Sequence, residues 1–224
     1  VADAIRIDDT VTGAPVVISG CTVRNYTNRF VYVSLSGKIE SLTIDDCIFI
    51  GADNSTTNKA IYASSAHTQV ETLSVTNSTF LNFNTGSNYF FRINCGEELV
   101  LMPVVLIDHC TFYNCYDRRG VYLYNAGRST IKNCISAFSE RRDDTKSFTA
   151  YGDESIVKNV ISYNVDLYGS APKENIISKN PLFVDAENGN FQLYKDSPAV
   201  GAGDDGSDLG DPRWGVSTEN APVG

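Results

Sequence analysis

The sequence predicts an all-β fold, a parallel β-helix or solenoid of about six or seven coils. Three observations lead to this prediction. One short phrase recurs six times, a second apolar phrase recurs at an almost constant spacing, and neither has the spacing of an amphipathic helix. Repeats of this length indicate an architecture in which each unit stacks on the one before it.

The first phrase alternates apolar and polar residues and is rich in Val, Ile and Thr, so we expect it to form a strand. The residues at its centre, which we call the pivots, are separated by 26, 31, 32, 24 and 26 residues. The pivots are Cys21, Cys47, Ser78, Cys110, Cys134 and Val160. Equivalent positions of stacked coils lie about 4.8 Å apart. We therefore expect the pivots to form one inward-facing column, because small, soft side chains suit a crowded interior.

A second strand follows the first in most units. We expect it at residues 30–34, 60–64, 90–94, 120–124 and 147–151. Within it, Val31, Ile61, Phe91 and Val121 are each 30 residues apart. Such regularity is difficult to obtain unless each unit is one turn of a coil.

The six cysteines also allow a disulfide or metal framework, since their number is even. Their spacing contains no C-x-x-C pair, and His67 and His109 are the only histidines, so we favour the buried column. Cys95 and Cys115 lie outside that column, and a disulfide between them stays open as an alternative.

Composition narrows the class of protein. The 224 residues contain no stretch typical of a linker, so one elongated domain, a monomer, is expected. The longest apolar run, residues 99–107, is too short to span a bilayer, and no membrane insertion is expected. A net charge of -9 and a pI near 4.7 argue against nucleic acid as a partner, because phosphates require a basic surface. Abundant Asn, Ser, Thr, Tyr and Gly favour a location outside the cell.

The last part of the chain carries a family resemblance. Residues 180–185 (NPLFVD), 189–193 (GNFQL) and 196–203 (DSPAVGAG) resemble the closing segment of secreted right-handed parallel β-helix proteins. Residues 210–214 (GDPRW) are similar to the ending of pectate-lyase-like proteins from bacterial polysaccharide-utilisation systems. The resemblance implies a right-handed coil over residues 1–178 and a C-terminal capping segment of the same domain over residues 179–224. It also implies that the protein is secreted or lies on the outer cell surface.

The ending has a physical interpretation of its own. Phe183 and Phe191 are expected to plug the last coil, and Pro181 and Pro198 to stop strand propagation. Trp214, the only tryptophan, is expected to belong to this plug rather than to serve as a sugar platform.

One candidate surface follows from alternation along the second strand. If Val31 points inward, Tyr32 points outward, and the same rule exposes Tyr62, Arg92 and Tyr122. Aromatic faces stack on sugar rings, and an Arg fork suits a uronic carboxylate or a sulfate. The alternative is that these residues only stabilise the sheet by pairing with their neighbours.

A second candidate surface lies in the turns that follow the pivots. Arg119 and Arg142 stand nine and eight residues beyond their pivots, so the turns over residues 117–119 and 140–146 should stack on neighbouring coils. A clustered basic site in an acidic protein suits an anionic polysaccharide. The alternative is an ion-pair network that neutralises itself, because carboxylates flank each arginine pair.

The same turns contain what a polysaccharide lyase needs, namely a base and groups that neutralise a uronate. The candidate bases are Arg118, Arg119, Arg141, Arg142 and Lys146. The candidate calcium ligands are Asp117, Glu140, Asp143 and Asp144. The compact acidic cluster expected of calcium-dependent lyases is missing, so no cofactor is predicted, with calcium as the alternative.

A hydrolase needs paired or tripled aspartates on adjoining strands. The pair Asp45-Asp46 and the single Asp108 lie on strands that contain pivots, but no further aspartate completes a convincing set with them. The predicted function is therefore non-catalytic recognition of a polysaccharide at the cell exterior. Two alternatives remain, a lyase acting on a uronic-acid polymer and a structural or adhesive segment of a larger surface protein.

Overall fold

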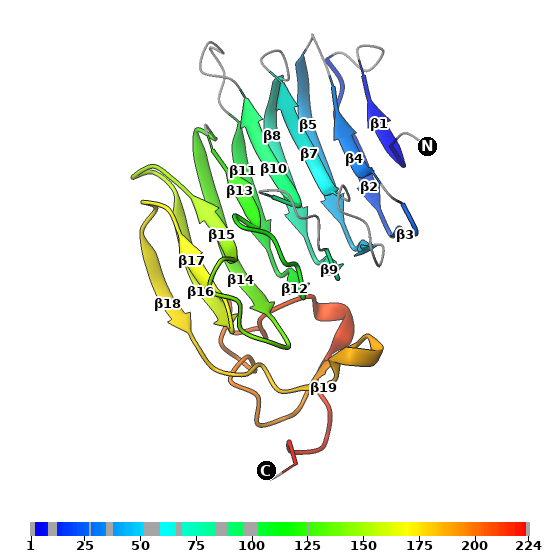
Figure 1. Cartoon of the computed structure of the whole chain (residues 1–224). Helices are drawn as coiled ribbons and strands as arrows, with labels where there is room; N and C mark the ends of the chain where they lie inside the picture. The colour runs from blue at the N-terminus through cyan, green and yellow to red at the C-terminus, as the bar shows by residue number, and fades with distance from the viewer. Residues whose placement is uncertain are drawn as a thin grey trace.

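The computed structural model describes residues 3–8, 13–26, 28–34, 38–51, 59–65, 69–83, 89–95, 103–124 and 126–222. Over these residues the protein is all-β, with long parallel sheets and two short 3-10 turns, η2 (Ala186–Asn188) and η3 (Pro212–Trp214). The arrangement is consistent with a β-helix or solenoid (Figure 1).

The first sheet has seven strands, and every pair in it is parallel. In spatial order the strands are β1 (Ile5–Ile7), β4 (Arg29–Val33), β7 (Lys59–Ser65), β10 (Phe91–Cys95), β13 (Val121–Leu123), β15 (Lys146–Ala150) and β17 (Asp166–Tyr168). The register aligns Val31, Ile61, Phe91 and Val121, as their constant spacing predicts, and all four side chains are fully buried.

The second sheet is built from the phrase that contains the pivots. One run of parallel strands consists of β2 (Val16–Ser19), β5 (Lys38–Asp45), β8 (Gln69–Thr76), β11 (Val104–Asp108), β14 (Arg128–Ala137), β16 (Ile156–Tyr163) and β18 (Lys173–Ile177). A second run consists of β3 (Thr22–Arg24), β6 (Ile48–Ile50), β9 (Thr79–Leu81) and β12 (Thr111–Tyr113), and it joins the far half of β14.

Each repeat bends at the residue before its pivot. That residue has a positive φ in every repeat: Gly20, Asp46, Asn77, His109, Asn133 and Asn159. Gly, Asn, Asp and His are the residues that adopt the left-handed conformation at least cost. The sequence therefore encodes the bend locally and repeats it.

The pivots form the predicted column, and they also complete the bend. Cys47, Cys110 and Cys134 are fully buried, and the register pairs Cys134 with Val160. The Cys134 Sγ donates a hydrogen bond of 2.9 Å to the carbonyl oxygen of Lys132, and the Ser78 Oγ donates one of 2.7 Å to that of Thr76. A small side chain with a donor thus satisfies the carbonyl two residues before it.

The described cysteines, including Cys115, are free thiols, and the side chain of Cys95 lies outside the described residues. Burial raises the pKa of the Cys110 and Cys115 thiols, so both stay protonated and unreactive. Beside the column, the ring of Phe80 stacks on Phe49 at 5.0 Å and on Phe112 at 4.8 Å between centroids. Small pivots and stacked rings together fill the interior.

The C-terminal segment, residues 179–222, runs back along the side of the repeats (Figure 1). It contains the antiparallel pair β19 (Phe183–Asp185) and β20 (Asn190–Leu193). Phe183 and Phe191 contact the ring of Tyr113 on β12, and the Trp214 Nε1 donates to the Thr79 Oγ1 on β9.

Phe183 and Phe191 were expected to plug the end of the last repeat. Their expected position is wrong, because both rings pack on Tyr113 of β12. Outward-facing apolar residues on β9, β12, β14 and β16 need cover, and the segment supplies it along the side. Trp214 has the structural role that was expected, because it packs on Phe191 with 5.3 Å between the rings.

Within the described residues, no helix has the length and apolar character required to cross a bilayer.

Candidate functional site

The outward-facing residues of the first sheet form a continuous column. The register pairs Tyr32 with Tyr62, Tyr62 with Arg92, and Arg92 with Tyr122. Arg6 on β1 extends the series at its other end by pairing with Tyr32. We call these five residues the outer column. Strand alternation and the repeat length align Tyr32, Tyr62, Arg92 and Tyr122 as expected, and the structure adds Arg6 to them.

Much of the outer column is covered by side chains of the protein itself. Tyr122 is only 5% exposed, because the rings of Tyr89 and Tyr124 stack on it at 5.9 Å and 5.7 Å. The guanidinium of Arg29 lies 3.5 Å from the centroid of the Tyr32 ring. The expectation that Tyr122 is an exposed platform is wrong, since alternation fixes its face but not what covers that face.

The middle of the column is a stack of cations and rings. The Lys59 Nζ lies 5.0 Å and the Arg92 guanidinium carbon 4.5 Å from the centroid of the Tyr89 ring, and the Arg92 Nη1 donates to the Tyr89 hydroxyl. Burial lowers the pKa of Lys59 and raises that of Tyr89. Such contacts stabilise the sheet, and they occupy faces that a ligand would otherwise use.

The two arginine turns lie on neighbouring repeats. The backbone N–H of Lys146 donates to the carbonyl oxygen of Asp117 at 3.3 Å, and the Thr149 Oγ1 donates to that of Arg119 at 2.9 Å. Their contact depends on Gly120, where a Cβ would lie 2.2 Å from the carbonyl oxygen of Lys146. The turns over residues 117–119 and 140–146 are therefore as close as two backbones can be.

Between these turns and the last strands of the first sheet is a cleft of about 440 Å³. Its lining combines cations, carboxylates and aromatic rings: Arg118, Arg119, Asp143, Asp144, Lys146, Tyr151 and Tyr168. We call it the arginine cleft.

The charges in the arginine cleft are only partly neutralised. Lys146 and Arg141 both pair with Asp166, at 3.2 Å and 3.0 Å. Although burial raises the pKa of Asp166, hydrogen bonds from these two cations lower it overall. Neither Arg118 nor Arg119 has an ion pair with any residue in the part of the chain that the structure describes. The network expected as the alternative thus forms around Asp166 and leaves two guanidinium groups for a ligand.

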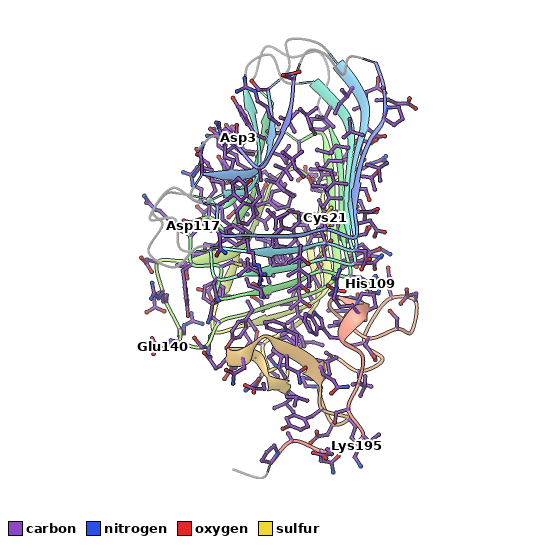
Figure 2. All side chains as sticks on the ribbon, turned by 90° about the vertical axis from the view of Figure 1, so that its right-hand side faces the viewer. Asp3, Cys21, His109, Asp117, Glu140 and Lys195 are labelled. Carbon is purple, nitrogen blue, oxygen red and sulfur yellow. The ribbon has the colours of Figure 1, made fainter. Side chains whose placement is uncertain are left out.

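Four of the residues predicted in these turns lie outside the lining of the arginine cleft, namely Asp117, Glu140, Arg141 and Arg142. The guanidinium of Arg142 packs over the ring of Tyr116 at 4.0 Å, and Arg141 is tied to Asp143 and Asp166 outside the lining. Glu140 is exposed; it lies, with Asp117, on the side of the molecule away from His109 (Figure 2). Arg142 is therefore not part of the cleft, contrary to the expectation.

The predicted calcium ligands do not converge. Asp117 is 2% exposed, whereas the side chain of Asp143 is 90% exposed and faces Arg141. Among the described residues, no three acidic, His or Cys side chains are arranged to hold a metal ion. Asp117, Glu140, Asp143 and Asp144 are thus not a calcium site in this arrangement.

Two lining residues, Tyr151 and Tyr168, were missed by the sequence argument. Tyr168 pairs in register with Thr149, which itself continues the outer column beyond Tyr122. The signal was present, because Tyr168 is the outward residue of one more strand. The last repeat is unusually short, which hid this signal. Only fifteen residues, 151–165, separate the end of β15 from the start of β17.

Two family models match separate parts of the chain. A domain of unknown function (DUF5123) matches residues 105–214, and another domain of unknown function (DUF4957) matches residues 5–83. No curated protein matches the chain. The arginine cleft lies wholly in the first of these regions, while the parallel pairing of β8 with β11 continues across the interval between the two.

Proposed function

We propose that this chain is a right-handed parallel β-helix of about six or seven coils that recognises an anionic polysaccharide outside the cell. The ligand would lie in the arginine cleft. The observation that carries the proposal is the pairing of two guanidinium groups, Arg118 and Arg119, with the exposed ring of Tyr168 in one hollow. Residues 179–224 are part of the same domain in this proposal.

The chemistry of the lining suits an acidic sugar. A guanidinium offers two parallel donors to a carboxylate or sulfate, and it does so from a rigid plane. Tyr168 is 55% exposed, so one ring face is accessible to the apolar face of a sugar. Asp143 and Asp144 supply acceptors for sugar hydroxyls at the rim.

The net charge of the protein makes this local arrangement informative. In a chain with a net charge of -9, the lining of the arginine cleft contains three cations and two carboxylates, so its local excess of charge is opposite in sign to that of the molecule. The arginine cleft therefore attracts a polyanion, while the acidic surface around it repels one. This contrast favours binding of a carbohydrate chain along one defined path.

Affinity electrophoresis tests the proposal with polygalacturonate, alginate and chondroitin sulfate in the gel. We expect at least one polymer to retard the parent protein, and Arg119→Ala to weaken that binding about tenfold. Arg128→Ala is the matched control, because Arg128 is exposed at the start of β14 in the other sheet and its loss changes the charge equally.

The same samples report on a lyase, since elimination from a uronate creates an unsaturated product that absorbs in the ultraviolet. Accumulation of that product would replace the binding proposal with the enzymatic one. Equal migration of the parent in the presence and absence of all three polymers would overturn the proposal, as would equal effects of the Arg119 and Arg128 substitutions.

A further inference from the structure

A second hollow, of about 270 Å³, lies between the strand ends of the second sheet and the C-terminal segment. Tyr113 of β12, Phe138 after β14 and Tyr163 of β16 form one wall, while Asn180, Phe183 and Glu187 of the C-terminal segment form the other. We call it the side pocket.

The side pocket is held by contacts between its two walls. The Tyr113 hydroxyl donates to the Glu187 Oε1 at 2.6 Å and so joins the two walls. The ring of Phe183 packs on Tyr113 with 6.2 Å between centroids, and Phe138 is 1% exposed. The hollow therefore has fixed aromatic walls rather than a shape that side chains could readily collapse.

Three polar groups that line the pocket are not used by the fold, one on half-buried Tyr163 and two on exposed Asn180 and Glu187. The hydroxyl of Tyr163 and the side-chain amide nitrogen of Asn180 have no hydrogen bond with any described residue. Glu187 uses one carboxylate oxygen for Tyr113, and the described residues leave the other oxygen without a partner. Donors and acceptors thus line a cavity whose walls are aromatic, which is the pattern of a small-molecule site.

Charge and size limit what fits. Glu187 is the only charged residue in the lining, so an anionic ligand would be repelled where the arginine cleft would attract it. Pockets for drug-sized ligands have volumes of roughly 300–1,000 Å³, and this pocket is smaller. One uncharged ring that carries several hydroxyl groups matches both limits.

We propose that the side pocket binds one neutral sugar residue. This inference extends the proposed function and rests on it in one point. The same glycan would place an acidic residue in the arginine cleft and a neutral residue in the side pocket. The ligand class would then be a heteropolysaccharide that contains both acidic and neutral sugars, rather than a uniform polyuronate.

The two sites share the segments that build them. Residues 113–119 run from Tyr113 in the pocket to Arg119 in the cleft, and residues 138–146 run from Phe138 in the pocket to Lys146 in the cleft. The two segments are in contact, because the Tyr116 hydroxyl on the first lies 3.0 Å from the Oγ of Ser139 on the second. A glycan chain could cross this surface from one site to the other.

Protein-observed NMR with neutral monosaccharides as probes tests the pocket by itself. We expect galactose, glucose, mannose, xylose or rhamnose to shift the backbone amides of Phe138, Ser139 and Glu187, and galacturonate to shift them less. Tyr163→Phe should weaken the effective probe about fivefold, because it removes one hydrogen bond and keeps the ring. Tyr194→Phe, a hydroxyl deletion in the C-terminal segment outside the pocket, should leave the affinity unchanged.

The outcomes separate this inference from the proposed function. If the parent binds no acidic polymer but neutral sugars still shift its amide signals, the proposed function is overturned and the side pocket is kept. Absence of shifts with all five neutral probes would overturn the side pocket, even if acidic polymers still retard the protein. Equal effects of Tyr163→Phe and Tyr194→Phe, or stronger shifts with galacturonate than with every neutral probe, would also overturn it.

Discussion

The guanidinium carbon of Arg119 lies 4.7 Å from the centroid of the Tyr122 ring. This contact joins the two surfaces that the sequence suggests separately, because Tyr122 belongs to the outer column and Arg119 to the arginine cleft. The buried ring of Tyr122 packs against the arginine, while Tyr168, which is exposed, also lines the cleft. A buried tyrosine and an exposed tyrosine thus lie two strands apart in one sheet, with Thr149 of β15 between them.

These two tyrosines should respond differently to truncation. Tyr122→Ala removes a buried ring and is expected to lower the free energy of unfolding by about 3 kcal/mol. Tyr168→Ala should change it by no more than about 0.5 kcal/mol, since that side chain is largely exposed, yet it should weaken polysaccharide binding. Urea denaturation and affinity electrophoresis measure the two effects. A large loss of stability in the Tyr168 variant would contradict this division.

The role of Arg119 depends on its shape as well as its charge. Arg119→Lys keeps the positive charge but removes the planar fork and the stacking on Tyr122. We expect binding of an anionic polymer to weaken by about threefold at constant ionic strength, less than in Arg119→Ala. If the lysine variant binds as tightly as the parent, charge alone accounts for recognition.

Gly120 should be essential to the stacking of the two turns. It has a φ of 56°, and an added Cβ would meet carbonyl oxygens of Lys146 and Ser147. Gly120→Ala is expected to lower the free energy of unfolding by at least about 2 kcal/mol. Gly189→Ala is the control, because φ is 82° there but no atom lies within 4 Å of the new Cβ. Its cost should be about 1 kcal/mol, from backbone conformation alone. Equal costs in urea denaturation would show that the close approach at Gly120 is unimportant.

His109 makes stability depend on pH near neutrality. Its Nδ1 lies 2.9 Å from the Asp108 Oδ1, and its Nε2 lies 2.7 Å from the Ser207 Oγ in the C-terminal segment. The hydrogen bond to Asp108, together with the charges of Asp108 and Asp205, raises the pKa of His109 against the effects of burial and Lys132. The imidazolium therefore stabilises the folded state.

The sign of this effect follows from linkage. The contribution is complete below pH 6.5, the unfolded value, and it is lost as the pH rises through the higher folded value. His109→Asn is the matched variant, because Asn occupies the equivalent left-handed position in three other repeats. The difference in unfolding free energy between parent and variant should shrink with rising pH. A difference that grows or stays constant would contradict the assignment.

Asp211 should anchor the C-terminal segment. Its carboxylate is buried and accepts hydrogen bonds from the Thr79 Oγ1 at 2.6 Å and the Arg213 Nε at 2.7 Å. Burial raises the pKa of this carboxyl despite these partners. Asp211→Ala is expected to lower the free energy of unfolding by about 3 kcal/mol.

Asp46→Asn is the control for this anchor, since it removes the charge but keeps a residue suited to the left-handed position; Asp46 pairs with the same Arg213 at 2.8 Å, and its side chain is 61% exposed. Its cost in thermal or urea unfolding should stay below about 1 kcal/mol. Similar costs for the two substitutions would argue that burial of Asp211 has no special weight.

The sequence predicted correctly those features that each repeat encodes by itself. Alternation of period two decides the face on which a strand residue lies, so the alignment of Val31 with Ile61 and of Tyr32 with Tyr62 follows from repeat length. The inward column of pivots follows in the same way. These features are local, and the same sequence pattern encodes them in each repeat.

Only the tertiary structure decided what covers each outer face and which charges stay unpaired. Tyr122 is buried by rings from other segments, and Thr79 is covered by Asp211, which lies 132 residues later in the chain. Likewise, Arg142 packs on the ring of Tyr116 outside the cleft, and Asp166 forms ion pairs with Arg141 and Lys146. Turns of unequal length and a C-terminal segment that occurs once carry no repeating pattern. Their positions depend on packing between distant residues, which alternation and spacing do not encode.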